Sequence, residues 1–199
     1  MNLHEHPDFE QAILRAAEHF RGRGLRPATI EKDYYVTEAL RIISVTAGDK
    51  VIFKGGTSLS KGWNLIQRFS EDADIFLDPL AFEPPLGKNG IDRELKKLRD
   101  AVGAHPMLTF VENESQTIGG FGRNDRFSYV QRFGGPGEVT NRVLAGVYCE
   151  LREQACRQIF VRELEALRRI THVGYYEAMA ARPRVLTKAC WARDCCEST

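Results

Sequence analysis

Two aspartates one residue apart, Asp72 and Asp74, are the side chains of this sequence best suited to chemistry. In a β-strand, residues i and i+2 point to the same face, so the two carboxylates would lie side by side while Ala73 and Ile75 point the other way. Two adjacent anions repel each other unless a cation lies between them. Mg²⁺ (or Mn²⁺) prefers carboxylate oxygens and completes its coordination with water and phosphate oxygens. The pair therefore predicts a divalent metal site that acts on a phosphorylated substrate.

A double glycine, Gly55-Gly56, precedes the aspartates and follows a short apolar run. Because glycine has no Cβ, the backbone there can adopt unusual dihedral angles and approach a triphosphate closely. The segment 57–69 is predicted to be helical, and the unpaired N–H groups at a helix start favour an anion. Ser58 could add a hydroxyl. The pattern predicts a bound nucleoside triphosphate whose reacting phosphorus is polarised by metal.

Each half of this pattern is weak alone. A Gly-Gly pair after a strand is commonly only a turn, and D-x-D is common on exposed strands. The order strand, Gly-Gly, helix and D-x-D strand is harder to explain by packing. Carboxylates in an otherwise apolar strand would cost free energy if they were buried without a partner. The combination favours phosphoryl-transfer chemistry.

The elements that must position these residues follow from hydrophobic periodicity and from glycine and proline breaks. Predicted helices cover residues 8–21, 30–44 with Thr29 as the cap, 57–69 and 91–104, and predicted strands cover 50–54, 72–78, 107–112, 126–133 and 141–151. The expected fold is a mixed α/β domain over residues 1–150, with a central mixed sheet flanked by helices. A helical C-terminal segment and a tail are expected over residues 151–199.

Composition is that of an ordinary globular protein, with 28 basic and 27 acidic residues among 199. The near-neutral total excludes little, because a local basic patch can still bind nucleic acid. No apolar run is long enough to span a membrane and the N-terminus lacks a secretion signal, so we expect a cytoplasmic protein. All five cysteines lie at or after Cys149 without paired C-x-x-C spacing, which indicates unligated thiols.

The central segment resembles a known family. Lys54-Gly55-Gly56-Thr57-Ser58-Leu59 matches a K-G-G-[TS]-x-L motif, and residues 68–74, RFSEDAD, match R-x-S-x-D-x-D. Both motifs are similar to those of the AbiEii/AbiGii (MenT-type) nucleotidyltransferase toxins, members of the DNA polymerase beta nucleotidyltransferase superfamily. The similarity covers roughly residues 25 to 145, and it includes the segment IEKDYYVTEALRII.

The resemblance implies a metal-dependent nucleotidyltransferase toxin of a toxin–antitoxin system. Such an enzyme transfers a nucleoside monophosphate from an NTP to an RNA acceptor, specifically the 3′ end of tRNA, and has a cognate antitoxin protein as partner. It also implies roles for individual residues. Asp72 and Asp74 would bind Mg²⁺ or Mn²⁺ as catalytic residues beside Ser70, and the nucleotide would be bound by Lys54, Gly55, Gly56, Thr57, Ser58 and Arg68. For Arg68, a structural ion pair that holds the acidic loop is the alternative to a phosphate contact.

The superfamily usually has a third carboxylate on a later strand, and Glu150 is the best candidate for that catalytic role. Counted by twos, Glu150 shares a face with Leu144, Gly146 and Tyr148. The alternative is a solvated residue at a strand end. The Lys and Asp that the family carries further on are not evident.

Arginine and cysteine become frequent after about residue 144. We hypothesise that the chain from there is not the family's original C-terminal half, through a frame change or truncation. The rival function is then a catalytically silent nucleotide-binding or antitoxin-binding remnant. A transferase that acts on a small molecule or on protein side chains is a third alternative.

Three further sets of charges are left out of the site. Glu31, Lys32 and Asp33 also fit the family pattern, but one turn of mixed charge is usually an exposed helix face. Lys61 is interpreted as a solvated helix lysine rather than a phosphate ligand. Asp78 lies two pleats beyond the aspartate pair and is left out of the site.

Overall fold

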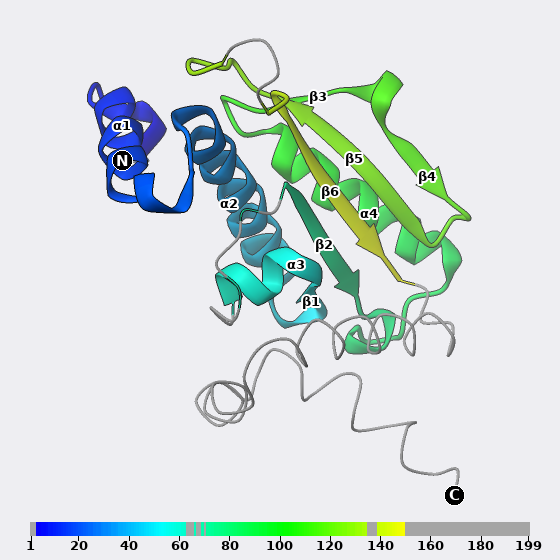
Figure 1. The fold of residues 1–199 in the computed structure, drawn as a ribbon. Coiled ribbons are helices and arrows are strands. Elements are labelled where there is room, and N and C mark those ends of the chain that lie inside the picture. Colours follow the sequence, from blue (N-terminus) through cyan, green and yellow to red (C-terminus); the bar gives the residue numbers. More distant parts are fainter. Residues whose placement is uncertain (1–2, 63–65, 67–68, 70, 135–138, 150–199) are drawn as a thin grey trace, which may run out of the picture.

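The computed structural model describes residues 3–62, 66, 69, 71–134 and 139–149 (Figure 1). The helices are α1 (Phe9–His19), α2 (Pro27–Ala47), α3 (Gly55–Thr57) and α4 (Lys88–Gly103). The strands are β1 (Val51–Lys54), β2 (Asp72–Leu77), β3 (Thr109–Phe110), β4 (Gln116–Ile118), β5 (Gly122–Ser128) and β6 (Arg142–Tyr148).

The strands form one mixed sheet in the order β1-β2-β6-β5-β3, and β4 pairs with β5 beside β3. β2 and β6 are parallel, and the other pairs are antiparallel. Helices α2 and α4 contact each other and pack on one face of the sheet, while α1 packs on α2 (Figure 1). The predicted mixed α/β fold with a central sheet and flanking helices is confirmed.

The core lies between this sheet face and the two helices. α4 buries one stripe because its apolar residues recur every three or four positions, the spacing that places side chains on one helix face. These residues are Ile91, Leu95, Leu98 and Val102. Facing them are alternate residues of the strands, as the period of two requires: Ala73, Ile75, Leu77, Phe127, Val143, Ala145 and Val147. The other face of the sheet therefore carries Asp72 and Asp74 of β2 and Asn124, Arg126 and Ser128 of β5.

Several predicted bounds were wrong. β5 begins at Gly122 rather than at residue 126, and β4 was not predicted. The first half of β5 could not be recognised as a strand in the sequence GRNDRFS. Its buried positions include a charged pair, Arg123 and Asp125, in place of apolar residues. The predicted helix over 57–69 begins earlier, at Gly55, and continues beyond α3 as a π-helical turn, Ser58–Gly62.

The start of α2 also differs from the prediction. The helix begins with Pro27 in its first turn and not after a Thr29 cap, because proline needs no N–H partner there. Glu31 and Lys32 are not solvated: their exposed fractions are 0% and 2%. The interpretation of this turn as an exposed face was therefore wrong for two of its three charges.

No helix among the described residues is both long and apolar enough to cross a membrane. Cys149 is a free, buried thiol, as expected, and burial raises its pKa to about 12. The other cysteines and the predicted C-terminal segment over 151–199 lie outside the described residues.

Candidate active site

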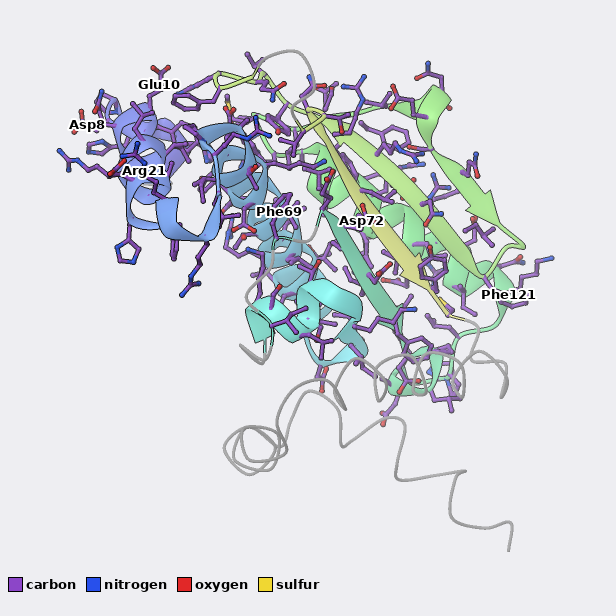
Figure 2. All side chains as sticks on the ribbon, viewed as in Figure 1. Asp8, Glu10, Arg21, Phe69, Asp72 and Phe121 are labelled. Carbon is purple, nitrogen blue, oxygen red and sulfur yellow. The ribbon has the colours of Figure 1, made fainter. Side chains whose placement is uncertain are left out.

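Asp72 and Asp74 stand at the start of β2, where Figure 2 labels Asp72, and strand alternation places both on the sheet face opposite α2 and α4. Ala73 and Ile75 alternate with them and are buried on the helix side. Asp72 is exposed and Asp74 is partly buried. The expected side-by-side arrangement of the two carboxylates is thus present in the backbone of one strand.

The charge of this pair is poorly compensated within the described part of the chain. Neither carboxylate lies in an ion pair there, although Lys54 on β1 is paired in register with Asp74. The Lys54 Nζ instead lies 4.7 Å from the centre of the Tyr148 ring. Burial raises the pKa of Asp74, Lys54 lowers it, and the neighbouring Asp72 raises it. Two carboxylates on one face, without an ion pair among the described residues, are the donor set that a hard cation such as Mg²⁺ or Mn²⁺ prefers, so the residues fit a divalent metal.

Gly55 brings the backbone of the glycine turn against Asp74. Its φ is +75°, a left-handed conformation, and a Cβ built there would lie 2.6 Å from the Asp74 Oδ2. Any larger residue would therefore collide with the carboxylate and strain the backbone. Gly55 and Gly56 begin α3 at this point. The turn and the carboxylate strand are in direct contact, as a shared site for a metal and a phosphate requires.

Thr57 and Ser58 follow the glycines and are buried. The Thr57 hydroxyl donates a hydrogen bond to the backbone carbonyl of Asp72. This bond fastens the glycine turn to the strand that carries both aspartates. The described contact of Thr57 is therefore structural, and its predicted role in binding the nucleotide stays a prediction.

The strand register identifies the neighbours of the two aspartates. On β6, Leu144 is paired with Asp72, and Gly146 is paired with Asp74. The next strand, β5, places Asn124 opposite Gly146. Within the described residues, no group of three or more acidic, histidine or cysteine side chains could hold a metal ion. Glu150, the predicted third carboxylate, lies outside the described residues, as do Ser70 and Arg68, and their roles stay predictions.

Tyr148 and Asn124 belong to the open face beside the aspartates and were not predicted as site residues. The Tyr148 hydroxyl donates to the Asn124 Oδ1 at 2.5 Å, and its ring covers Gly146, where a Cβ would lie 2.9 Å from the Tyr148 Cε2. Burial raises the pKa of Tyr148, and the nearby charge of Asp74 adds to the rise. Strand alternation along β6 places Tyr148 on the same face as Gly146, so this residue could have been identified from the sequence. Asn124 was missed because β5 was expected to start at residue 126.

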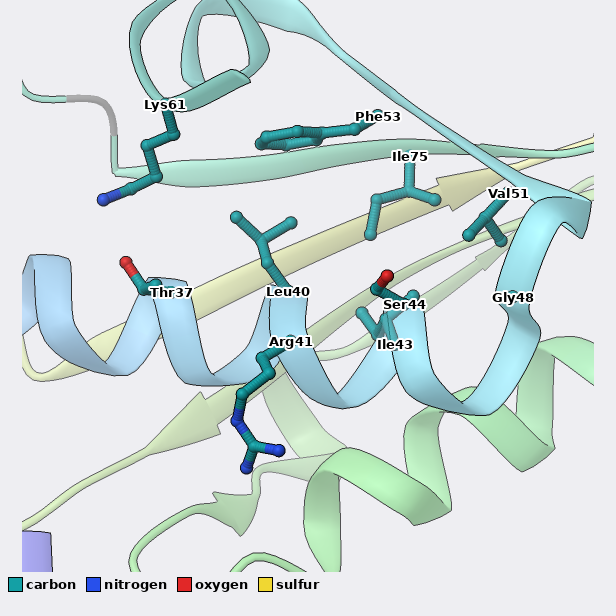
Figure 3. Close-up of a pocket in the computed structure, with 10 residues that line it drawn as sticks. All are labelled: Thr37, Leu40, Arg41, Ile43, Ser44, Gly48, Val51, Phe53, Lys61 and Ile75. Carbon is teal, nitrogen blue, oxygen red and sulfur yellow. The ribbon is translucent and has the colours of Figure 1, made fainter. Parts of the chain in front are cut away.

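A cavity of about 370 Å³ lies away from the aspartates, between α2 and β1 (Figure 3). Leu40 and Ile43 of α2 face Val51, Phe53 and Ile75 of the sheet across it. Its lining is largely apolar, and the strand residues that line it point to the helix side of the sheet. The cavity is therefore distinct from the carboxylate face.

A strand, a glycine turn, a helical turn and a D-x-D strand on a mixed sheet with helices on one face define a nucleotidyltransferase-type fold. The model of the family described as "Nucleotidyl transferase AbiEii toxin, Type IV TA system" matches residues 39–143. The chain belongs to this family, which confirms the resemblance found in its motifs. Comparisons with curated proteins and with solved structures found no match.

Proposed function

We propose that this protein transfers a nucleoside monophosphate from an NTP to an RNA acceptor, specifically the 3′ end of tRNA, in a reaction that depends on Mg²⁺ or Mn²⁺. The observation that carries the proposal is the contact between Gly55 and the carboxylate of Asp74, next to Asp72. A glycine turn that touches two carboxylates without an ion pair in the described part of the chain would join a phosphate-binding element to a metal-binding one. Family membership supports the class of reaction.

In the proposed reaction, a hydroxyl oxygen of the acceptor forms a bond to the α-phosphorus of the NTP. The bond from the α-phosphorus to the bridging oxygen of the β-phosphate breaks, pyrophosphate leaves, and the hydroxyl proton passes to solvent. A divalent cation, when bound by Asp72 and Asp74, would supply positive charge that stabilises the developing negative charge on the phosphates. The chain itself holds the carboxylates side by side on a rigid strand.

The remaining assigned residues would bind the triphosphate. Gly55 and Gly56 would let the backbone approach its oxygens, and Ser58 and Lys54 would add a hydroxyl and a positive charge. Arg68 and Ser70 would complete the site from the segment before β2. The toxin family implies a nucleotide substrate and an antitoxin partner for this chain.

The test is incubation of the purified protein with Mg²⁺, each of the four α-³²P-labelled NTPs in turn, and total tRNA. The matched control carries Asp72→Asn and Asp74→Asn, which keep the side-chain size and remove both charges. Label on tRNA from the wild type and none from the control is the expected result. Label on a protein or small molecule in place of RNA would replace the proposed acceptor. Equal labelling by the control would refute the proposed site.

A silent remnant is the second candidate, and two observations favour it. The strand positions beside the aspartates carry Leu144 and Gly146, without a third carboxylate in the described part of the chain. The family match ends at residue 143, close to the change in composition at about residue 144. NTP binding without transfer to any acceptor would favour this candidate. A family-like continuation in another reading frame of the coding DNA would support it further.

A further inference from the structure

One turn at the start of α2 carries three consecutive charged residues, Glu31, Lys32 and Asp33, and each contacts a different segment of the chain. We propose that this turn is a positioning anchor. It holds three segments in place relative to one another: β2, which carries the two aspartates; the glycine-turn helix, that is, α3 with the π-helical turn Ser58–Gly62; and the connection between β5 and β6. The proposal rests on the proposed nucleotidyl transfer and adds positioning residues to it. The three residues would act on the site through the segments that they contact.

Lys32 contacts the residue that directly precedes β2, the strand of the two aspartates. Its side chain is only 3% exposed, and its ammonium forms an ion pair with the carboxylate of Glu71, the residue directly before Asp72. The same ammonium lies 3.4 Å from the hydroxyl oxygen of Thr140, which precedes β6. Lys32 therefore joins the two chain segments that lead into the parallel strands β2 and β6.

Asp33 holds the helical turn that follows the glycines. Its Oδ2 accepts a hydrogen bond from the Lys61 Nζ at 2.6 Å. Lys61 belongs to the π-helical turn Ser58–Gly62, and its side chain reaches toward α2 in Figure 3. Lys61 is exposed, as expected of a solvated lysine, and it also pairs with Asp33, 28 positions earlier.

Glu31 holds the connection between β5 and β6. Its carboxylate accepts hydrogen bonds from the backbone N–H of Arg132 at 3.0 and 3.1 Å and from that of Phe133 at 3.1 Å. Burial raises the pKa of Glu31, while these backbone donors lower it. The carboxylate thus supplies acceptors to a loop whose backbone groups would otherwise lack partners.

Energetics favour a role in geometry over a role in stability. Burying an ion pair seldom stabilises a protein more than apolar residues of the same volume, because each charge loses its hydration. Directional contacts, however, fix the distance and orientation of the groups they join. Lys32 contacts Glu71, directly before Asp72, and Asp33 contacts Lys61 in the helical turn that follows Gly55, so two of the three contacts join segments that adjoin the proposed site. Residues that orient metal ligands through such contacts typically change affinity or activity 10- to 100-fold when replaced.

The experiment compares Lys32→Met, the double variant Lys32→Met/Glu71→Gln, and Asp33→Asn with the wild type. Asp92→Asn is the matched control, because Asp92 pairs with Lys96 at 2.7 Å on α4, outside the anchor. Three quantities are measured: the melting temperature, the affinity for Mn²⁺ alone by electron paramagnetic resonance, and kcat and KM for NTP in the tRNA labelling assay.

The single variant Lys32→Met is expected to lose both stability and Mn²⁺ affinity. The double variant removes both charges, so its melting temperature should recover while its Mn²⁺ affinity stays about tenfold weaker than wild type. Asp33→Asn should raise the KM for NTP more than it lowers kcat, because it frees the glycine-turn helix. Asp92→Asn should match the wild type in all three measurements.

Mn²⁺ affinity of the double variant within about twofold of the wild type would overturn the anchor, as would affinity losses that merely follow the fraction of unfolded protein. The Mn²⁺ measurement does not require transfer. If the wild type labels no acceptor but the double variant still binds Mn²⁺ about tenfold more weakly, the proposed function fails and the anchor stands.

Discussion

Each face of the central sheet carries a pair of charged residues at positions i and i+2 that includes aspartate. The two pairs differ in whether their charges are opposite or alike. On the helix-covered face, Asp125 of β5 is buried and is paired with Arg123, two residues earlier on the same strand. The Arg123 Nε lies 3.1 and 3.0 Å from the two carboxylate oxygens, and the Arg123 Nη1 donates to the Thr117 hydroxyl. On the open face, Asp72 has Asp74 as its i+2 neighbour.

The ion pair of Arg123 and Asp125 is structural, whereas we propose that the charge of Asp72 and Asp74 is functional. The covered pair satisfies its own hydrogen bonds, as buried ions must, and leaves nothing for a ligand to supply. The open pair combines two like charges, and Lys54 is the cation beside it among the described residues, so we expect the pair to gain from an external positive ion. An uncompensated cluster that a fold retains at some cost in stability indicates a site.

Breaking the covered pair should have the largest effect on stability. Arg123→Met would leave Asp125 as a buried, unpaired charge, and we expect a loss of about 3–5 kcal/mol in the free energy of unfolding. Urea denaturation measures it. The matched control is Arg142→Met, which removes an equally bidentate pair with Glu114 at a partly exposed position. The control should lose only about 0–1 kcal/mol. Equal losses of unfolding free energy in the two variants would mean that burial does not determine how much each ion pair contributes to stability.

Closing the contact between the glycine turn and Asp74 should have an intermediate effect. Gly55→Ala adds a Cβ that collides with the Asp74 carboxylate at a positive φ, and we expect a loss of about 1–3 kcal/mol in stability together with weaker NTP binding. Gly48→Ala is the control, because Gly48 has φ +61° but no heavy atom within 4 Å of a built Cβ. Thermal unfolding and fluorescent-nucleotide titration measure the two effects. Unchanged NTP binding in Gly55→Ala would contradict the role of the turn.

Removing the open pair should have the smallest effect on stability. A pKa raised by burial means that the folded protein holds the proton of Asp74 more tightly than the unfolded chain does. Stability from this group is thus complete below the unfolded pKa and is lost as the pH rises through the folded pKa. At neutral pH the ionised group disfavours folding. Asp72→Asn with Asp74→Asn should therefore leave metal-free stability unchanged or raise it by up to about 1 kcal/mol. A clear loss of metal-free stability in calorimetry would assign the pair a structural role.

How much of this could be predicted from the sequence depended on how locally each feature is encoded. The shared face of Asp72 and Asp74 follows from strand alternation alone, and the Gly-Gly turn follows from residue type. Neither pattern shows that Gly55 touches Asp74, because that contact depends on the register between β1 and β2.

The charged turn at the start of α2 could not be predicted from local pattern. Glu31 and Lys32 resemble solvated residues because helix periodicity weighs charge as exposure, whereas their partners lie 101 and 39 positions away. β5 was displaced for the same reason, since its buried Arg123 and Asp125 look like surface residues. Long-range pairing of buried charges is the information that a single sequence lacks.

The most direct test of the contrast between the two faces is Mn²⁺ binding, measured by electron paramagnetic resonance on the wild type and on two variants. The first variant carries Asp72→Asn and Asp74→Asn, and the second carries Arg142→Met as a control that alters charge elsewhere on the sheet. We expect the wild type and Arg142→Met to bind Mn²⁺ alike and the aspartate variant to bind it at least about tenfold more weakly. Equal Mn²⁺ affinity in all three proteins would show that Asp72 and Asp74 do not form a metal site.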